Sequence, residues 1–261
     1  MQQLTITFLG TGTSGGVPMV ACSCDVCNST DILDKRLRSS IMVQSATTTI
    51  VVDATPDFRQ QMLQHGVKKL DGILLTHAHK DHLGGLDDSR GFQYIQQKAT
   101  QLYGSKKTLQ GVKIELPYAF EEKKYPGVPE FELHEIDDVP FVIGDIHVVP
   151  IWVWHYKMRV HGFRFGDFTY ITDANRIDVE EQAKILGSHT LVLNALRKEQ
   201  HMSHFTLDEA VQMAKHLQVP EAYFTHVSHQ LGFHQQISAE LPQGMHLAYD
   251  GLQLKCRGCN L

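Results

Sequence analysis

The segment 76–82 (THAHKDH) constrains this chain more than any other feature. It directly follows the apolar run 72–75 (GILL). Its strong metal ligands are three histidines and one aspartate: His77, His79, Asp81 and His82. Imidazoles and carboxylates lose hydration when they lie close together, and a bound cation offsets that loss. The segment therefore predicts a buried strand that ends in a metal-binding loop.

Three later polar residues stand at the ends of predicted strands. Each directly follows a β-rich run, and they are His155, Asp173 and His226. A single residue of this kind is commonly a cap or a solvated surface group. Loops at strand ends also carry function, however, and together with the segment 76–82 four strand ends here carry metal-ligating residue types. We therefore expect these residues to join the segment 76–82 in one metal site.

The first third of the chain predicts strands, one helix and a further strand. The glycine-rich stretch 10–16 predicts a tight turn rather than a nucleotide-binding loop, because it lacks the Gly-Lys-Ser/Thr ending. Apolar residues at helical spacing predict a helix over 56–64. Strands are predicted at 4–9, 40–44, 48–53 and 70–75, the second and third forming a hairpin.

The rest of the chain continues this alternation after an irregular stretch. Residues 103–138 predict a peripheral surface excursion, with a lid as the alternative and β-like pieces at 112–116 and 131–136. Helices are predicted at 179–186 and 207–217, the second with a capping box at 206–209. Strands are predicted at 141–143, 146–152, 163–165, 168–172, 191–193, 223–225 and 246–249. The alternation predicts an α/β fold.

Composition fits a single globular domain over residues 1–261, because 42% of the residues are hydrophobic. No stretch approaches the ~20 apolar residues of a membrane helix, and the first residues do not resemble a signal peptide. We therefore expect no membrane segment and a cytoplasmic location. The formal net charge of −5 disfavours a nucleic-acid partner and leaves small anionic substrates open. A homodimer is compatible with these features.

The five cysteines fall into two clusters, unlike a secreted disulfide framework. The first cluster supplies three thiolates within six residues: Cys22, Cys24 and Cys27. This spacing can wrap a tetrahedral zinc that needs a fourth ligand, and His229 is the expected fourth. Three buried free thiols are the alternative. We assign no role to Cys256 and Cys259 near the C-terminus.

The order of the ligands resembles that of the metallo-β-lactamase fold superfamily. The stretches 9–18 (LGTGTSGGVP) and 22–27 (CSCDVC) further resemble its PhnP-like phosphodiesterase branch, and the likeness runs over nearly the whole chain. The resemblance implies an αβ/βα sandwich in which two mixed β-sheets are flanked by helices. It also implies two metal ions at the edge between the sheets.

The same resemblance implies which residues hold which ion. One ion has the ligands His77, His79 and His155, the other has Asp81, His82 and His226, and the bridging ligand is Asp173. Nitrogen and carboxylate ligands fit Zn, Mn or Fe, of which we expect Zn or Mn. The two ions would activate a bridging water as hydroxide and stabilise the charge that develops at phosphorus. The resemblance makes the cysteine site a structural zinc site.

A leaving alkoxide needs a proton, and the stretch 201–206 (HMSHFT) offers a donor before a predicted helix. His204 resembles the family histidine that contacts the phosphate and serves as general acid, a role typically worth about 10²–10⁴-fold in rate. His201 is the competing choice, and a helix-capping or solvent-exposed histidine is the structural alternative. His204 and Asp81 are the predicted catalytic residues.

The leading hypothesis is a dinuclear metal-dependent hydrolase of small, cyclic phosphodiesters. A transfer-RNA 3′-processing endonuclease shares the ligand order, but the span from His155 to Asp173 holds little more than one hairpin and leaves no room for an RNA-grasping arm. A β-lactamase or lactonase is compatible with the fold alone. A non-catalytic metal-binding protein of quinone cofactor biosynthesis has a similar cysteine site, but the seven intact ligands favour catalysis.

Overall fold

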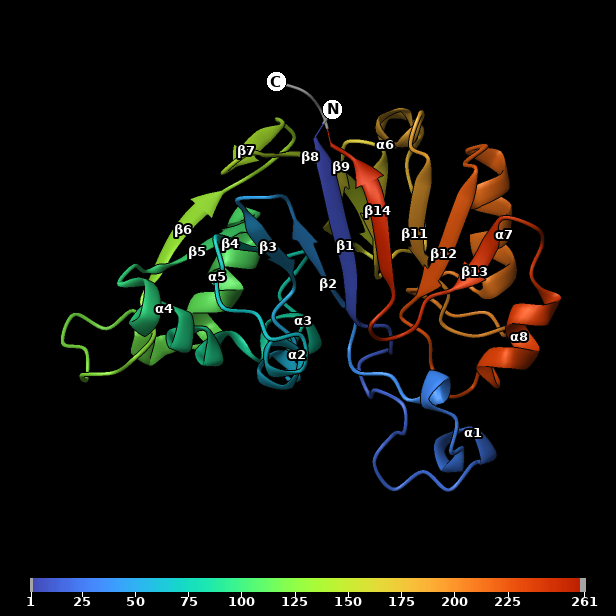
Figure 1. The fold of residues 1–261 in the computed structure, drawn as a ribbon, viewed down its shortest axis with the longest axis horizontal. Coiled ribbons are helices and arrows are strands. Elements are labelled where there is room, and N and C mark those ends of the chain that lie inside the picture. Colours follow the sequence, from blue (N-terminus) through green and yellow to red (C-terminus); the bar gives the residue numbers. More distant parts are fainter. Residues whose placement is uncertain (1, 259–261) are drawn as a thin grey trace.

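Two seven-stranded β-sheets pack face to face, and helices cover the outer face of each sheet (Figure 1). The structure is a computed structural model that describes residues 2–258. Both sheets mix parallel and antiparallel pairs. The predicted αβ/βα sandwich of two mixed sheets flanked by helices is therefore confirmed.

The first sheet has the strand order β14-β1-β2-β3-β4-β5-β6. It is antiparallel from β14 to β3 and parallel from β3 to β6. Its strands are β1 (Gln3–Gly10), β2 (Ser40–Gln44), β3 (Thr49–Val52), β4 (Gly72–Leu74), β5 (Thr100–Gly104), β6 (Phe131–Glu135) and β14 (Gln253–Arg257). The predicted hairpin of β2 and β3 is confirmed.

The second sheet has the strand order β13-β12-β11-β10-β9-β8-β7. It is antiparallel from β7 to β10 and parallel from β10 to β13. Its strands are β7 (Phe141–Ile143), β8 (Ile146–His155), β9 (Met158–Phe165), β10 (Phe168–Ile171), β11 (Thr190–Asn194), β12 (Glu221–Thr225) and β13 (Met245–Leu247). All seven overlap the strands that the sequence predicts.

Most helices are short and lie on the outside of the sandwich. The α-helices are α1 (Asp25–Asn28), α2 (Phe58–Gln64), α3 (Lys80–Leu83), α4 (Arg90–Gln96), α5 (Lys106–Glu115), α6 (Val179–Ile185), α7 (Leu207–His216) and α8 (His234–Glu240). The 3-10 helices are η1 (Ile32–Asp34), η2 (Leu86–Ser89) and η3 (Pro117–Ala119). The predicted capping box at the start of α7 is present. Among the described residues, no helix has the length and apolar character needed to cross a membrane.

Three apolar layers hold the sandwich together. The layer between the sheets joins Ile6 and Phe8 of β1 with Phe163 and Phe165 of β9, and all four are fully buried. A second layer lies under α6, α7 and α8, and a third lies under α2 and α5. Burying one such aromatic side chain contributes about 1.5–3 kcal/mol. This packing fixes the edge at which the strand-end residues meet.

Two predictions for residues 103–138 are wrong. The stretch 112–116 lies mainly in α5 and is not β-like, because Ser105 caps the helix and Leu109 and Val112 bury one face at helical spacing. The region is also more than a surface excursion, since α5 packs on the first sheet and β6 extends that sheet. The stretch between η3 and β6 is an irregular exposed loop, as are residues 137–138 after β6. The predicted strand at 131–136 is confirmed as β6.

Candidate metal centre

The segment after β4 is held in place by the buried carboxylate of Asp53. Its Oδ1 accepts a hydrogen bond from the Thr76 backbone N–H at 2.8 Å. Its Oδ2 accepts from the Thr76 hydroxyl at 2.8 Å and from Nδ1 of His82 at 2.7 Å. The helix α3 starts directly after His79 and returns His82 to the end of the strand. One carboxylate thus fixes both the start and the end of the ligand segment.

The first group of ligand atoms draws on both sheets. The atoms lie within 4.8 Å of one another and belong to His77, His79 and His155. Nε2 of His77 lies 2.9 Å from Nδ1 of His79. Nδ1 of His155 lies 3.0 Å from the carbonyl oxygen of Ser203. That oxygen can only accept, so Nδ1 donates and Nε2 of His155 keeps the lone pair that a metal ligand requires.

The second group contains two carboxylates and two histidines. Its atoms lie within 4.8 Å of one another and belong to Asp81, His82, Asp173 and His226. Oδ1 of Asp173 lies 3.4 Å from Nε2 of His82 and 3.0 Å from Nδ1 of His226. Its Oδ2 lies 3.9 Å from Nε2 of His77, in the first group. Asp173 therefore stands between the two groups with one oxygen toward each.

The residues of the second group fit a divalent cation. Nδ1 of His82 donates to Asp53, which leaves the lone pair on Nε2. This buried Nε2 has no hydrogen-bond partner, although Asp81 Oδ2 lies 3.2 Å away and Asp173 Oδ1 lies 3.4 Å away. The lone pair of Nε2 and the two carboxylate oxygens thus face one another with no positive charge between them. A cation held by these nitrogen and oxygen atoms would satisfy all three groups.

Burial and neighbouring charges control the protonation of the ligands. Burial holds the pKa of His77 well below its ordinary value and lowers the pKa of His226 to about 4. Burial alone would raise the pKa of Asp173, but attraction to His226 and His82 holds it well below its usual range. These neutral imidazoles and this ionised carboxylate are the forms that bind metal ions. Burial alone would lower the pKa of His82, but attraction to Asp173, Asp53 and Asp81 raises it well above its ordinary value, so a bound cation would take the place of its Nε2 proton.

Asp53 contacts the ligand segment directly, and the sequence analysis did not predict it as a site residue. It shares an unusual backbone with Asp173 and His226, since their φ angles are +66°, +55° and +57°. Left-handed backbone at a non-glycine residue costs about 1–3 kcal/mol and is concentrated at functional sites. Its position in the sequence could have indicated this, because Asp53 stands at the end of the predicted strand 48–53, as Asp173 stands at the end of the predicted strand 168–172.

The structure places His204 at the edge of both groups. Its Nε2 lies 3.3 Å from Oδ2 of Asp173, and its ligand atom is within 4.8 Å of those of Asp173 and His155. Its Nδ1 lies 3.0 Å from Oγ of Ser203 and 3.1 Å from Nδ1 of His201. His204 is therefore the inner histidine of the pair, and His201 reaches the centre only through it.

The cysteine cluster and its expected fourth ligand also come together. The ligand atoms of Cys22, Cys24, Cys27 and His229 lie within 4.8 Å of one another. Nδ1 of His229 lies 3.4 Å from Sγ of Cys22 and 3.2 Å from Sγ of Cys24. The contact with His229 lowers the pKa of the Cys24 thiol to about 6, which favours the thiolate form that binds zinc. Cys256 is buried, and Cys259 lies outside the described residues.

The three cysteines lie in the long connection between β1 and β2, and the start of this connection contacts the strand end that carries His226. Backbone hydrogen bonds link Thr11 and Thr13 to Val227 at 2.9 and 3.1 Å. The Thr13 hydroxyl lies 3.3 Å from Nε2 of His226. The loop that projects with α1 below the sandwich in Figure 1 therefore returns directly to the metal centre.

A family model described as a β-lactamase superfamily domain matches residues 48–227. The chain belongs to the β-lactamase superfamily. The match spans both ligand groups, from the loop after β4 to His226. Within this superfamily, a solved diphosphatase from the PhnP family has a TM-score of 0.92 and 39% sequence identity, covering 98% of this chain and 99% of that one. The PhnP-like resemblance seen in the sequence is confirmed.

Two further relatives carry different names. An octanoyltransferase from Porphyromonas gingivalis is 38% identical over 249 residues, which are 94% of this chain and 50% of that protein. The chain thus spans half the length of this curated relative. Zn²⁺-bound PqqB from Methylobacterium extorquens has a TM-score of 0.76 at 19% identity, covering 96% of this chain and 99% of that one, which shows a common fold alone. Together with the diphosphatase, the superfamily match supports a hydrolase with the metallo-β-lactamase fold.

Proposed function

We propose that this chain is a dinuclear metal-dependent hydrolase that cleaves small phosphodiesters, cyclic ones among them. The observation that carries the proposal is Asp173, because its two oxygens face two separate ligand groups. One Zn or Mn ion would have the ligands His77, His79 and His155, the other would have Asp81, His82 and His226, and Asp173 would bridge them. Since these ligands come from both sheets, we propose that residues 1–261 act as one domain.

When bound, two divalent ions would supply Lewis acidity for the phosphate and for the attacking water. The side chains of this chain provide the geometry. Asp53 holds His82 in the tautomer whose Nε2 faces the centre. Asp81 and Asp173 offset only part of the charge of two divalent ions, so the site would attract an anionic ester although the whole chain is acidic.

His204 is the proposed general acid. Its Nε2 faces the centre at 3.3 Å from Asp173, where a proton can pass to the leaving oxygen of the ester. Its Nδ1 is held by the Ser203 hydroxyl and by His201. His201 would therefore position His204 rather than contact the substrate.

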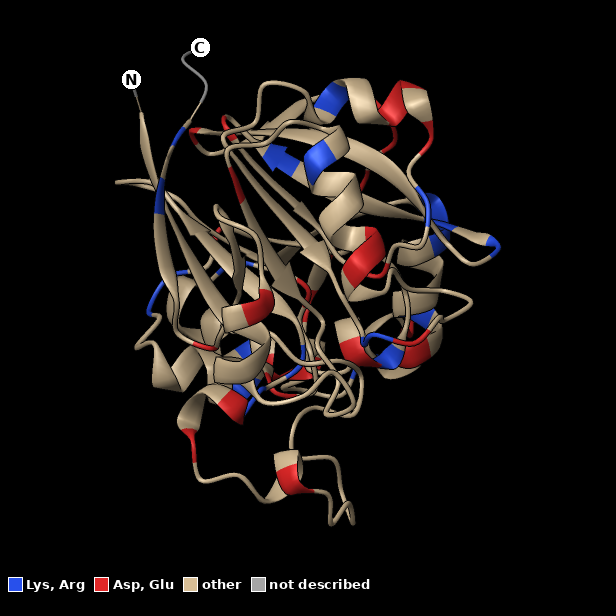
Figure 2. Cartoon of the chain, turned by 90° about the vertical axis from the view of Figure 1, so that its right-hand side faces the viewer, with Lys and Arg blue, Asp and Glu red and all other residues tan. Residues whose placement is uncertain are grey.

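Small substrates are favoured over nucleic acid for two reasons. β8 and β9 are joined by a two-residue turn, and β10 follows β9 closely, so no arm stands between His155 and Asp173. Lys and Arg are interspersed with Asp and Glu over the elements seen in Figure 2, without a tract of one sign. A protein that binds a nucleic-acid backbone usually presents a basic stripe.

The name of the similar PhnP-family diphosphatase adds diphosphates to the substrates worth testing.

The cysteine cluster completes the proposal with one structural zinc held by Cys22, Cys24, Cys27 and His229. The four ligand atoms lie within 4.8 Å of one another, and the thiolate form of Cys24 is favoured. Such a zinc would brace the loop that contacts His226. Clustered thiols without disulfides among the described residues suit the reducing cytoplasm, which is the location we propose.

The octanoyltransferase name of one relative supports a second candidate, hydrolysis of an octanoyl ester or thioester. This chain spans only half of that relative, whose other half is unmatched. The same metal geometry could polarise an acyl carbonyl instead of a phosphate. The two candidate functions therefore use the same site and differ only in the substrate.

A substrate panel tests the proposal. Protein loaded with Mn²⁺ or Zn²⁺ is assayed against bis(p-nitrophenyl) phosphate, cyclic phosphodiesters, diphosphates, precursor transfer RNA and p-nitrophenyl octanoate. We expect the highest kcat/KM on a small phosphodiester, lost in Asp173→Asn and retained in Asp250→Asn, which changes a half-buried aspartate outside the ligand groups. Exclusive turnover of the octanoate would favour the second candidate. No hydrolysis of any phosphodiester by fully loaded protein would refute the first.

A further inference from the structure

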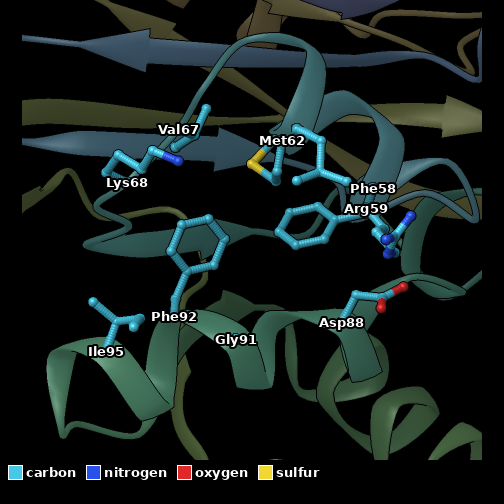
Figure 3. A pocket seen from close by; sticks show the side chains of 10 residues that line it. Phe58, Arg59, Met62, Val67, Lys68, Asp88, Gly91, Phe92 and Ile95 are labelled. Atoms are coloured by element: carbon cyan, nitrogen blue, oxygen red, sulfur yellow. The ribbon is translucent and has the colours of Figure 1, made fainter.

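A pocket of about 360 Å³ opens on the outer face of the first sheet, between α2 and the segment η2–α4 (Figure 3). None of its lining residues belongs to the metal groups. Binding sites for small molecules have volumes of ~300–1,000 Å³ and are mainly apolar with a few polar groups. The pocket has the size and composition of such a site.

The floor of the pocket is formed by Phe58, Met62 and Phe92. The rings of Phe58 and Phe92 meet edge to face with centroids 6.3 Å apart. Phe58 and Met62 are buried in the layer beneath α2, whereas Phe92 is half-buried and packs at its margin. The floor is therefore fixed by the core and does not depend on a ligand.

The wall formed by α4 is open. A surface helix normally buries its apolar stripe, yet α4 has no buried residue. Phe92 and Ile95 lie three positions apart and line the pocket, and Ile95 is 79% exposed. A Cβ added at Gly91, which also lines the pocket, would meet no atom within 4 Å. Apolar surface thus faces empty space on this side.

The rim carries two cations. Lys68 and Arg59 line the pocket, and among residues 2–258 neither side chain forms a hydrogen bond or ion pair. Figure 3 shows Asp88 on the same side as Arg59, whereas Lys68 stands at the other end and points toward the space between Met62 and Phe92. The end near Lys68 is therefore the one that favours an anionic group.

We propose that this pocket binds a medium-chain fatty acid anion. The acyl chain would lie on Phe58, Met62 and Phe92, and the carboxylate would contact Lys68. At roughly 30 Å³ per water-sized group, the volume of about 360 Å³ holds roughly a dozen such groups, which suits a chain of about eight to twelve carbons. The charge of Lys68 selects an anionic head group, because it would repel a cationic head group at the same position.

Calorimetric titration of the full, metal-loaded chain with decanoate tests this proposal directly. We expect saturable binding of one equivalent, and no comparable binding of decyltrimethylammonium, which has the same tail and the opposite charge. The measurement does not involve hydrolysis, so it is independent of the proposed enzymatic function. Absence of saturable decanoate binding overturns the proposal, and it is the result expected if the pocket receives apolar side chains of a partner protein.

Three variants locate the binding. Gly91→Leu places a side chain in the pocket on a residue type that stabilises helices better than glycine, so the fold is retained and decanoate binding should fall at least about tenfold. Lys68→Glu should weaken it about fivefold. Lys69→Glu makes the same charge change at the next residue, which pairs with Asp71 and does not line the pocket, and should leave binding unchanged. Equal decanoate affinity in Gly91→Leu and the original chain overturns the assignment.

Discussion

Replacing Asp53 by asparagine should weaken the binding of one metal ion without removing any metal ligand. The carboxylate accepts from the Thr76 N–H, from the Thr76 hydroxyl and from Nδ1 of His82. An amide keeps one acceptor oxygen for the Thr76 N–H, but its NH₂ group would face His82. Nδ1 of His82 would then accept and Nε2 would carry the proton, so the lone pair that faces Asp81 and Asp173 would be lost.

The magnitude follows from the role of a group that orients a ligand. Mutating such a group typically lowers metal affinity 10–100-fold. At 1.4 kcal/mol per tenfold change, this corresponds to about 1.4–2.8 kcal/mol of binding free energy. The free energy of unfolding of the metal-free protein should fall by about 1.5–3 kcal/mol, because a buried charge-assisted hydrogen bond is lost. The assay is calorimetric titration of metal-free protein with Mn²⁺, followed by metal analysis after dialysis.

Asp250→Asn is the matched control. Asp250 is a half-buried aspartate that also accepts from a threonine hydroxyl and a backbone N–H, at 2.7 and 2.6 Å, but among residues 2–258 it accepts no hydrogen bond from a histidine. We expect this variant to lose stability and to keep its affinity for both active-site ions. If Asp53→Asn binds two ions with unchanged affinity, the tautomer of His82 is not set by Asp53 and the reasoning fails.

The other predictions concern a ligand, the cysteine site and pH. Asp81→Ala should lower turnover more than about a hundredfold with little change in the far-ultraviolet circular dichroism spectrum, and retained activity would contradict its assignment. Cys24→Ser should lose about one zinc equivalent by metal analysis and melt at a lower temperature; an unchanged zinc count would exclude the cysteine site. Burial lowers the pKa of His161 to about 4, against 6.5 for the ordinary group, so the unfolded chain binds more protons and stability falls by up to about 3 kcal/mol as the pH drops from 6.5 to 4. His161→Phe should lose less stability over that range in denaturant titrations, and an equal loss would contradict this cause.

The candidate ligands could be predicted because each follows a β-rich run in the sequence. The histidine segment follows β4, His155 ends β8, and Asp173 and His226 follow β10 and β12. Strand ends are local features, and metal-ligating residue types at several of them are rare by chance. Their convergence at one edge of the sandwich came from the resemblance, since spacing along the chain does not determine which strand ends are neighbours.

Other features depended on contacts that the sequence pattern does not contain. β14 pairs with β1 across nearly the whole chain, and its five residues (QLKCR) alternate between polar and apolar types, but the run is short and has no β-branched or aromatic side chain to mark it as a strand. α4 and α8 went unpredicted because α4 buries no residue and α8 buries only His234 and Ile237. The β-branched residues Val112 and Ile114 suggest a strand, but packing of one face of α5 against the first sheet overrides that propensity. Asp53 was counted as a strand residue because its partner His82 lies in a different element.

The two ligand groups take His77 and His79 from a loop of the first sheet, and His155 and His226 from the second. Metal occupancy and association of the two sheets are therefore linked equilibria. Each ion that binds only the folded chain adds about 2.7 kcal/mol to the free energy of unfolding at a hundred times its Kd. A chelator should consequently make both halves of the chain susceptible to protease at the same time. Scarcity of the metal in a cell would shorten the lifetime of the protein as well as leave its metal site inactive.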